Sequence, residues 1–380
     1  MRVTVIGWYG TETIGDRAIL LGIASILGKA AEKVHFNIGS LFPFYTEKTI
    51  REDASFFELV GEKANQFSFS VFNSKHQNAL TTSIDESQLV IVGGGPLMHI
   101  NPMYILSFGF KYAQKKGIKT MVFGCGVGPL HKPKHIKATE NLLAHSDFTL
   151  FRDEKAEEYL AKIGIARKGD FIGVDPAVLS TLAFKDRYGT KQKVENSYGV
   201  ICLRAFPSEY STASISEKVN AFLEEKVAEL LTQTEMDLLL LPMHYFHVGG
   251  DDRIFLSELK RKLNNPRVRV QEKPLSTMET MECMRDAEFC VGMRFHSVVL
   301  ETILNPDVHV LDYTEPDIGK ISGFMELVGL PTIDNRRYIN LQTAEDQTLS
   351  IPAPQQEPEL TDLRRRAVEM EEKVLGWLTV

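Results

Sequence analysis

Four basic residues lie at or behind the ends of short apolar runs that are typical of β-strands, and a fifth begins the helix predicted after such a run. They are Arg152, Arg204, Arg294, His296 and Lys320. A charge that is buried without a partner is costly, so cations at strand ends are unusual for core packing alone. Guanidinium, imidazolium and ammonium groups brought to one edge of a sheet would bind phosphate and carboxylate groups. The pattern therefore predicts a site for a small anionic ligand.

Each of these cations has an alternative role as one half of an ion pair. Carboxylates close in sequence to the same strand ends are Asp153, Asp175 and Asp312. In the segment Met-Arg-Phe-His, Arg294 and His296 are two residues apart, so in an extended segment both side chains would point to the same side. If residues 297–304 then form a helix, its N-terminal N–H groups would add to the anion site.

Glycine-rich segments end three apolar runs in the first half of the chain. They are residues 7–15, 90–99 and 122–130. Glycine permits positive φ and lets a ligand approach backbone N–H groups, so we single out Gly94, Gly95 and Gly126 as candidate substrate-binding positions. Tight strand-to-helix turns are the alternative. The spacing of Gly7, Gly10 and Gly15 matches neither a dinucleotide-binding fingerprint nor a phosphate-binding P-loop.

Two further residue types could take part in chemistry. Asp16 could act as a base, although its place at the start of a predicted helix favours N-terminal capping or pairing with the helix dipole. His244 follows a strand of the second half and could contact phosphate or another substrate. His247 lies three residues later, but two histidines without a third ligand are weak evidence for a metal site, so we expect none.

The elements that must position these residues alternate between strand and helix throughout the chain. Ten runs read as strands: 1–7, 33–39, 88–95, 119–128 and 148–153, then 198–204, 237–244, 267–270, 288–294 and 307–313. Amphipathic stretches separate many of them, which predicts α/β architecture with two parallel sheets. Functional residues of such folds gather at the carboxyl ends of the strands.

Three parts follow from this order. Residues 1–180 and 198–350 are each predicted to form a Rossmann-like domain, with the polar stretch 180–197 as the linker. After a proline-rich segment, apolar residues of 358–380 recur at three- and four-residue spacing, which predicts a helix that packs back on the body. We expect the two domains to face a cleft.

Composition excludes several classes of function. The 380 residues carry a formal net charge of −7, which argues against a nucleic-acid-binding protein. Four cysteines, without C-x-x-C spacing, are typical of buried thiols in a reducing compartment. The sequence shows neither a signal segment nor an apolar run near the about 20 residues that span a bilayer. We expect a cytoplasmic protein with at most peripheral membrane contact.

The order of motifs resembles the polysaccharide pyruvyl transferase family. The motifs are GWYGTETIGDRAIL (7–20), GGGPL (93–97), GCGVGPL (124–130), RDEKAEEYL (152–160), DPA (175–177), MRFH (293–296) and YTEPDIGKISGF (313–324). The sequence departs from the family pattern at Thr13, Arg17, Cys125 and Ala156. The resemblance implies two Rossmann-like domains of the glycosyltransferase B type, the first on the acceptor side and the second on the donor side.

The resemblance also implies an activity, the transfer of pyruvate from phosphoenolpyruvate to a sugar of a cell-surface polysaccharide or its precursor, as a ketal. By similarity, Arg152, Arg294, His296 and Lys320 would bind phosphoenolpyruvate, with no cofactor. His296 is then the natural general acid, and Asp16 could be the base toward the acceptor hydroxyl. The acceptor could be lipid-linked or nucleotide-activated. Two alternatives stay open: a nucleotide-sugar-dependent glycosyltransferase, and a family member that binds without catalysis.

Overall fold

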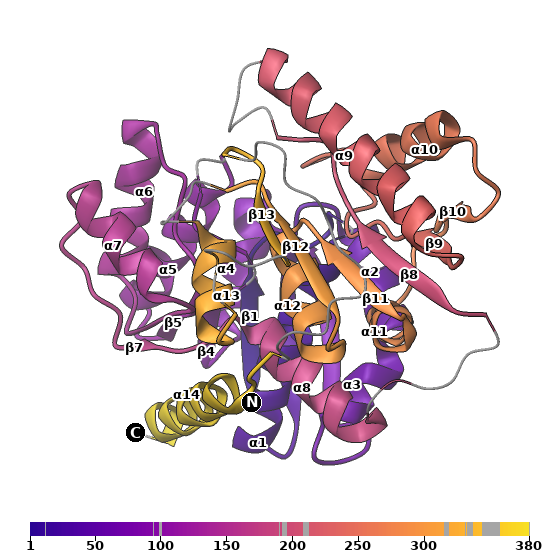
Figure 1. Cartoon of the computed structure of the whole chain (residues 1–380). Helices are drawn as coiled ribbons and strands as arrows, with labels where there is room; N and C mark the ends of the chain where they lie inside the picture. The colour runs from indigo at the N-terminus through magenta and orange to yellow at the C-terminus, as the bar shows by residue number, and fades with distance from the viewer. Residues whose placement is uncertain are drawn as a thin grey trace. The chain divides into compact units, whose positions relative to one another are not determined.

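The chain divides into two compact units that we describe separately. The computed structural model describes residues 1–11, 13–93, 95–98, 101–189, 191, 196–207, 213–314, 319–330, 332, 337–343 and 358–379. Unit 1 comprises Met1–Ala183 and Leu363–Val380, and unit 2 comprises Phe184–Asp362 (Figure 1). The cleft that the sequence predicts between the two domains stays a prediction.

Unit 1 alternates strands and helices along the chain. Its elements are β1 (Arg2–Ile6), α1 (Ile14–Ala30), β2 (Val34–Ser40), α2 (Pro43–Glu52), α3 (Ala54–Val60), β3 (Phe67–Asn73), α4 (Gln77–Asp85), β4 (Leu89–Gly93), α5 (Met103–Lys115), β5 (Lys119–Cys125), α6 (Pro133–Ala144), β6 (Phe148–Phe151), α7 (Glu154–Lys162), β7 (Phe171–Ile172), α8 (Pro176–Tyr188) and α14 (Thr361–Thr379). Helix α8 begins in unit 1, and its last residues, 184–188, belong to unit 2, so the first part of the stretch predicted as a linker is helical instead.

The strands described in unit 1 form one parallel sheet of seven in the order β3-β2-β1-β4-β5-β6-β7. Each residue of β4 is buried, which is typical of a parallel strand whose two faces are both covered. Apolar residues such as Val90 and Val92 pack with Leu106 and Phe110 of α5 in a continuous core. The central strands therefore form a rigid base for the loops at their carboxyl ends.

Helix α14 packs on unit 1 along one apolar face. Its buried residues are Leu363, Ala367, Met370 and Val374. Trp377 stacks on Phe148 of β6 with ring centroids 5.2 Å apart, and Glu371 forms an ion pair with Lys29 at the end of α1. Figure 1 shows α14, in yellow, beside the start of the chain. Across the residues that the structure describes, none of the helices combines the length and apolar character that crossing a bilayer requires.

Unit 2 repeats the same architecture. Its elements are β8 (Tyr198–Cys202), α9 (Ala213–Gln233), β9 (Asp237–Leu240), α10 (Asp252–Leu263), β10 (Val268–Val270), α11 (Thr277–Asp286), β11 (Phe289–Gly292), α12 (Phe295–Leu304), β12 (Val308–Asp312), α13 (Lys320–Leu327) and β13 (Tyr338–Asn340). Within its described residues, six parallel strands run in the order β10-β9-β8-β11-β12-β13.

Both sheets have the strand order of a Rossmann fold, 3-2-1-4-5-6, when the strands of each unit are numbered from its first. The predicted fold class, with two Rossmann-like domains, is confirmed. The order reverses between β1 and β4 in unit 1 and between β8 and β11 in unit 2. Ligands of such sheets bind outside the carboxyl ends of the strands at this point of reversal. Each unit thus has one edge where binding residues are expected.

Candidate functional site

In unit 2, two predicted cations follow the two strands at the point of reversal. Arg204 lies two residues behind β8, and Arg294 lies two residues behind β11. Arg204 donates from Nη2 to the carbonyl of Gly249 at 3.4 Å, and Arg294 donates from Nη2 to the carbonyl of Gly250 at 3.2 Å. Consecutive carbonyls of one turn therefore bind both guanidinium groups, which holds the two arginines at the same loop.

Arg294 is also one half of a bidentate ion pair with Asp252, the first residue of α10. Its Nε donates to Oδ2 at 2.8 Å, and its Nη2 donates to Oδ1 at 2.5 Å. The Asp252 side chain is 2 % exposed and also accepts the backbone N–H groups of Met243 and His244. The ion-pair alternative thus holds for Arg294, but with a carboxylate that is distant in sequence. The pair fixes the direction of the guanidinium.

Three predicted cations gather around one tyrosine. The guanidinium of Arg204 lies 5.7 Å from the ring centroid of Tyr313, and Nζ of Lys320 lies 5.7 Å from the same centroid. The positive charges of Lys320, Arg204 and Arg294 all act on the Tyr313 hydroxyl and lower its pKa, Lys320 most strongly. We call Arg204, Arg294 and Lys320 the cation cluster. It is the arrangement that the sequence predicts for binding an anion.

His296 lies in the first turn of α12, which corrects the geometry expected from the sequence. The helix begins at Phe295, with Arg294 as its extended N-cap residue, so Arg294 and His296 do not share one side of an extended segment. The Ser297 hydroxyl donates to the Arg294 carbonyl at 2.8 Å. His296 is half-buried beside the N–H groups of the helix start, where the positive end of the dipole favours an anion.

His244 is buried below the turn that holds the two arginines. A Cβ atom on Gly249 would lie 2.7 Å from the His244 ring, so the glycine is required for this close approach. The backbone of His244 exchanges two hydrogen bonds with Asp252. His244 therefore supports the arginine-binding turn, and a role in direct substrate contact stays a prediction. The described part of the chain contains no cluster of histidine, cysteine and carboxylate side chains that could hold a metal ion.

In unit 1, Asp16 lies in the first turn of α1 behind β1. It is buried, and desolvation together with the nearby Asp175 carboxylate raises the pKa of Asp16 to about 7. A hydrogen bond from Thr13, the N-cap residue, offsets only part of this shift. Asp16 therefore lies in the first turn of the helix, where it can pair with the helix dipole, but Thr13 and not Asp16 is the N-cap residue. Its carboxylate nevertheless has the proton affinity of a general base near neutral pH.

A small pocket opens beside Asp16. It is lined by Trp8, Tyr9, Gly10, Thr11, Thr13, Asp16, Arg17, Leu20, Thr46 and Thr49. Its volume of about 20 Å³ is enough for one water molecule or one hydroxyl group. The buried hydroxyl of Tyr9 has no hydrogen-bond partner among the described residues. The pocket therefore offers a buried donor next to a carboxylate.

The glycine positions of unit 1 have packing roles that the structure makes explicit. Gly95 has φ +68°, and a Cβ atom there would lie 2.6 Å from the Trp8 ring and 3.7 Å from Oδ1 of Asp16. A Cβ atom on Gly126 would lie 2.5 Å from the Arg152 guanidinium. Both glycines therefore allow a side chain of the site to approach the backbone. Gly94 lies outside the described residues.

Arg152 is held by two carboxylates of unit 1. Its Nε donates to Asp153 at 3.1 Å and its Nη1 donates to Asp175 at 3.2 Å, while the side chain is only 3 % exposed. The ion-pair alternative therefore holds for Arg152. It lies in unit 1, whereas the cation cluster and His296 belong to unit 2. Because Asp175 also acts on Asp16, Arg152 influences the charge around the pocket.

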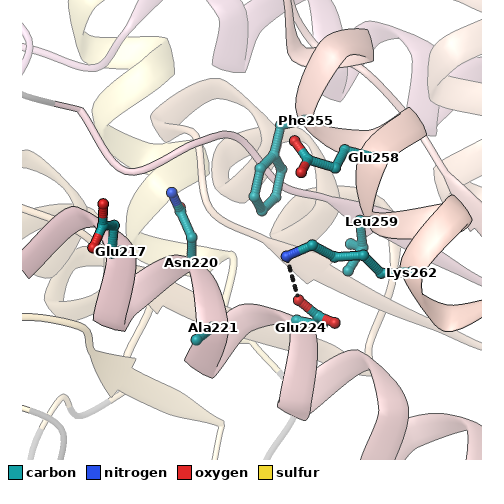
Figure 2. A pocket seen from close by; sticks show the side chains of 8 residues that line it. All are labelled: Glu217, Asn220, Ala221, Glu224, Phe255, Glu258, Leu259 and Lys262. Carbon is teal, nitrogen blue, oxygen red and sulfur yellow. Dashed lines mark hydrogen bonds and ion pairs between the residues drawn. The ribbon is translucent and has the colours of Figure 1, made fainter.

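A larger pocket of about 300 Å³ lies between α9 and α10 (Figure 2). Its lining carries three carboxylates, Glu217, Glu224 and Glu258, and its one lysine, Lys262, is bound to Glu224 at 2.8 Å. This surplus of negative charge would repel phosphate and carboxylate groups. The pocket is therefore no candidate for the anion predicted from the sequence.

Sequence reasoning missed five residues of the candidate site: Tyr9, Asp252, Tyr313 and the two glycines of the arginine-binding Gly249–Gly250 turn. The run His-Val-Gly-Gly-Asp-Asp could have indicated a loop followed by a helix start near His244. Tyr313 reads as an ordinary end of an apolar strand, and its importance depends on three cations that are far apart in sequence. The motif at residues 313–324 contains both Tyr313 and Lys320, but no local signal could have predicted that Arg204 and Arg294 approach the same tyrosine.

The sequence model of the polysaccharide pyruvyl transferase family matches residues 14–304 of the chain. The chain belongs to this family. Family membership supports a transferase that carries a pyruvyl group to polysaccharide. The matched range includes Asp16, Arg152, Arg204, Arg294 and His296, and the family resemblance of the sequence is thereby confirmed. A search of curated proteins found no significant match.

Solved structures of other enzymes share the fold of this pyruvyl transferase family member. UDP-GlcNAc 2-epimerase from Methanocaldococcus jannaschii matches with a TM-score of 0.60 and 16 % identity over 100 % of this chain and 99 % of that chain. The UDP-N-acetylglucosamine 2-epimerase from Rickettsia bellii matches with a TM-score of 0.57 and 12 % identity over 100 % of this chain and 97 % of that chain. A trehalose 6-phosphate synthase from Burkholderia multivorans matches with a TM-score of 0.53 and 11 % identity over 100 % of this chain and 96 % of that chain. At such identity, the likeness concerns the fold alone.

One departure from the pyruvyl transferase pattern has a structural explanation. Arg17 is buried and donates from Nε to Asp53 at 2.7 Å, with Glu52 at 3.4 Å from its Nη1. The residue therefore ties α1 to the end of α2. Cys125, another departure, is a buried free thiol at the end of β5.

Proposed function

We propose that this family member transfers the pyruvate unit of phosphoenolpyruvate to two hydroxyl groups of a sugar, which forms a cyclic ketal and releases phosphate. The observation that carries the proposal is the cation cluster of Arg204, Arg294 and Lys320 at the point where the strand order of unit 2 reverses. Family membership supports the pyruvyl group, and the cluster supports a donor with several negative charges.

The chemistry of the donor matches this cluster. Phosphoenolpyruvate carries a carboxylate and a phosphate, with about two to three negative charges at neutral pH. Two guanidinium groups can each bind an oxyanion through a planar pair of donors, and the ammonium of Lys320 adds a compact charge. The carboxylate of Asp252 balances only one of these cations. The cluster thus keeps positive charge for the ligand.

The reaction needs a proton at C3 of the enol and hydroxyl attack at C2. His296, at the start of α12, is the proposed donor of the proton to C3. The first acceptor hydroxyl then forms a bond to C2, the C2–O bond to phosphate breaks, and the second hydroxyl closes the ring. Of the two protons that the hydroxyls lose, one balances the proton gained at C3 and the other leaves with phosphate. The cation cluster would stabilise the charge on the departing phosphate.

The proposed base toward the acceptor is Asp16. Its raised pKa and its place beside a pocket the size of one hydroxyl group support this role. The Tyr9 hydroxyl at the same pocket could bind the acceptor oxygen. For Arg152, direct contact with phosphoenolpyruvate stays a proposal from family resemblance, and its ion pairs support a second role in positioning Asp175. The proposed steps use side chains of the chain alone and need no cofactor.

Turnover provides the test. Purified protein is incubated with phosphoenolpyruvate and a panel of simple, lipid-linked and nucleotide-activated sugars, and phosphate release is followed together with the product mass. We expect release that depends on one acceptor and is lost in Arg204→Ala. Arg269→Ala serves as a matched control, because Arg269 of the same unit forms an exposed ion pair with Asp237. Transfer of a sugar from a nucleotide sugar, with no consumption of phosphoenolpyruvate, would overturn the proposal.

A further inference from the structure

Tyr313 is the residue on which the cation cluster converges, and no step above assigns it a role. It follows β12, and its side chain is 4 % exposed. Its backbone carbonyl accepts a hydrogen bond from the Gln342 amide at 2.9 Å, which fixes the residue from the β13 side. The Arg204 guanidinium and Nζ of Lys320 each lie 5.7 Å from the centroid of the Tyr313 ring.

The charges that face this phenol come from several elements. Arg204 follows β8, Arg294 precedes α12, and Lys320 begins α13. Two carboxylates lie near these cations: Asp252 is bound to Arg294, and Asp312 accepts hydrogen bonds from Thr314 and Tyr338. Positive charge is therefore in excess around the hydroxyl. Of these cations, Lys320 acts most strongly on the pKa of the phenol.

Other buried or half-buried tyrosines show how unusual this environment is. Burial raises the pKa of Tyr9, Tyr198 and Tyr245, because an apolar environment disfavours the phenolate. Tyr245 has a guanidinium over its ring as well, that of Arg253 at 5.5 Å, yet its pKa is still raised. For Tyr313, burial also acts to raise the pKa, but Lys320, Arg204 and Arg294 more than offset it, so the pKa is lowered.

We propose that Tyr313 is a second proton-transfer residue of the donor site, whose hydroxyl protonates the oxygen that leaves C2 with phosphate. The inference rests on the proposed function. In this step the C2–O bond breaks, its electron pair stays on the phosphate oxygen, and the proton moves from Tyr313 to that oxygen. The phenolate that remains is held by Lys320, Arg204 and Arg294. The second acceptor hydroxyl, as it closes the ring, supplies the proton that restores the phenol through solvent.

The same geometry links the phenol to ligand binding. A bound phosphate or phosphoenolpyruvate would compensate the positive charge of the cluster, so the phenol would hold its proton more strongly in the complex than in the ligand-free protein. At alkaline pH, where part of Tyr313 is ionised, anion binding should therefore take up protons. As phosphate leaves, the positive charge of the cluster is no longer compensated, and this favours proton loss from Tyr313.

The ultraviolet absorption of tyrosinate tests the ionisation without any turnover. The wild-type protein and Tyr313→Phe are titrated from neutral to alkaline pH with and without inorganic phosphate, and Tyr245→Phe is the matched control. We expect the difference between wild type and Tyr313→Phe to show one tyrosine ionising below the others and shifting upward with phosphate. Tyr245→Phe should retain this early step. An early step that persists in Tyr313→Phe, or one that phosphate leaves unchanged, would overturn the proposal.

Activity provides the second arm. In Tyr313→Phe, which keeps the aromatic ring and removes only the hydroxyl, kcat should fall roughly 10²–10⁴-fold while the Kd for phosphoenolpyruvate changes much less. A melting curve of each variant verifies folding. If wild type consumes phosphoenolpyruvate and Tyr313→Phe does so equally fast, this inference is wrong and the proposed function stands. If wild type neither binds nor consumes phosphoenolpyruvate, the proposed function fails, and the titration with phosphate still decides whether Tyr313 responds to an anion.

Discussion

The guanidinium of Arg294 is bound by both carboxylate oxygens of Asp252, through Nε at 2.8 Å and Nη2 at 2.5 Å. A cation that we propose to bind the donor is thus positioned by a buried acid that comes 42 residues earlier in the chain. The Asp252 carboxylate compensates part of the positive charge of the cation cluster, and it fixes the direction of the Arg294 guanidinium. It makes the site dependent on the start of α10.

The first prediction concerns that pair. Asp252→Asn leaves the buried Arg294 charge without its counter-ion, so we expect the free energy of unfolding to fall by about 3–5 kcal/mol. Added phosphoenolpyruvate should then raise the melting temperature of the variant more than that of wild type, because the anion replaces the missing charge. Asp251→Asn is the control, since Asp251 pairs with Arg253 in a more exposed contact. Equal ligand-induced shifts in all three proteins would contradict the prediction.

The second prediction separates binding from chemistry at residues 293–296. Arg294→Lys loses the bidentate geometry, so the Kd for phosphoenolpyruvate should rise by the equivalent of about 2 kcal/mol. His296→Gln should instead lower kcat roughly 10²–10⁴-fold with a smaller change in Kd. Calorimetry and the phosphate-release assay on the same preparations measure both quantities. If His296→Gln abolishes binding but retains turnover at saturating donor, His296 is a phosphate ligand and the proton comes from another group.

The third prediction concerns Asp16, whose pKa in the folded protein is about 7 against 3.8 in an unperturbed chain. Between about pH 4 and pH 7 the folded protein therefore holds a proton that the unfolded chain has lost, so stability falls as the pH rises through this interval. Asp16→Asn should raise the free energy of unfolding at pH 8 by up to about 4 kcal/mol, and far less at pH 4.

Activity of the wild type should rise through pH 7 as Asp16 ionises, and Asp16→Asn should lose that dependence together with most of its turnover. Chemical denaturation at two pH values measures the stability effect. Asp85→Asn is the control in the same unit, because Lys116 holds the pKa of Asp85 below its usual value, the opposite direction. If Asp16→Asn is less stable than wild type at pH 8, the ionised Asp16 side chain does not lower the free energy of unfolding, and the prediction is wrong.

The fold was largely predictable because its central strands are continuous apolar runs. All ten predicted strands are found, as β1, β2, β4, β5, β6 and β8–β12. The structure adds β3, β7 and β13, which are edge strands. Edge strands are short or half-buried and lack the continuous apolar pattern, as the alternation of exposed and half-buried residues in β3 shows.

The site was predictable only in part. Cations behind strands identified Arg204, Arg294 and Lys320, since parallel strands bring their carboxyl ends to one edge. The partners of these cations could not be predicted from the sequence. The ion pair of Asp252 with Arg294 and the approach of three cations to Tyr313 both depend on tertiary contacts. The helix start at Phe295 was missed because its N-cap residue is Arg294, which is not one of the residue types that usually mark a helix start.

The fourth prediction concerns metal ions. The cation cluster can compensate phosphate charge by itself, so binding of phosphoenolpyruvate should survive treatment with EDTA with an unchanged Kd. Calorimetry before and after chelation measures this directly. Loss of binding in EDTA that Mg²⁺ restores would show that a divalent cation takes part in the donor site.

The most direct test of the account is the binding of phosphoenolpyruvate itself, measured by calorimetry and by the shift of the melting temperature beside UDP-sugars at the same concentrations. The account predicts saturable binding of phosphoenolpyruvate, with stabilisation of about 2.7 kcal/mol at a hundredfold excess over Kd. It also predicts that the binding weakens in Arg204→Ala but not in Arg269→Ala. Stabilisation by UDP-sugars with none by phosphoenolpyruvate would contradict the assignment of the donor.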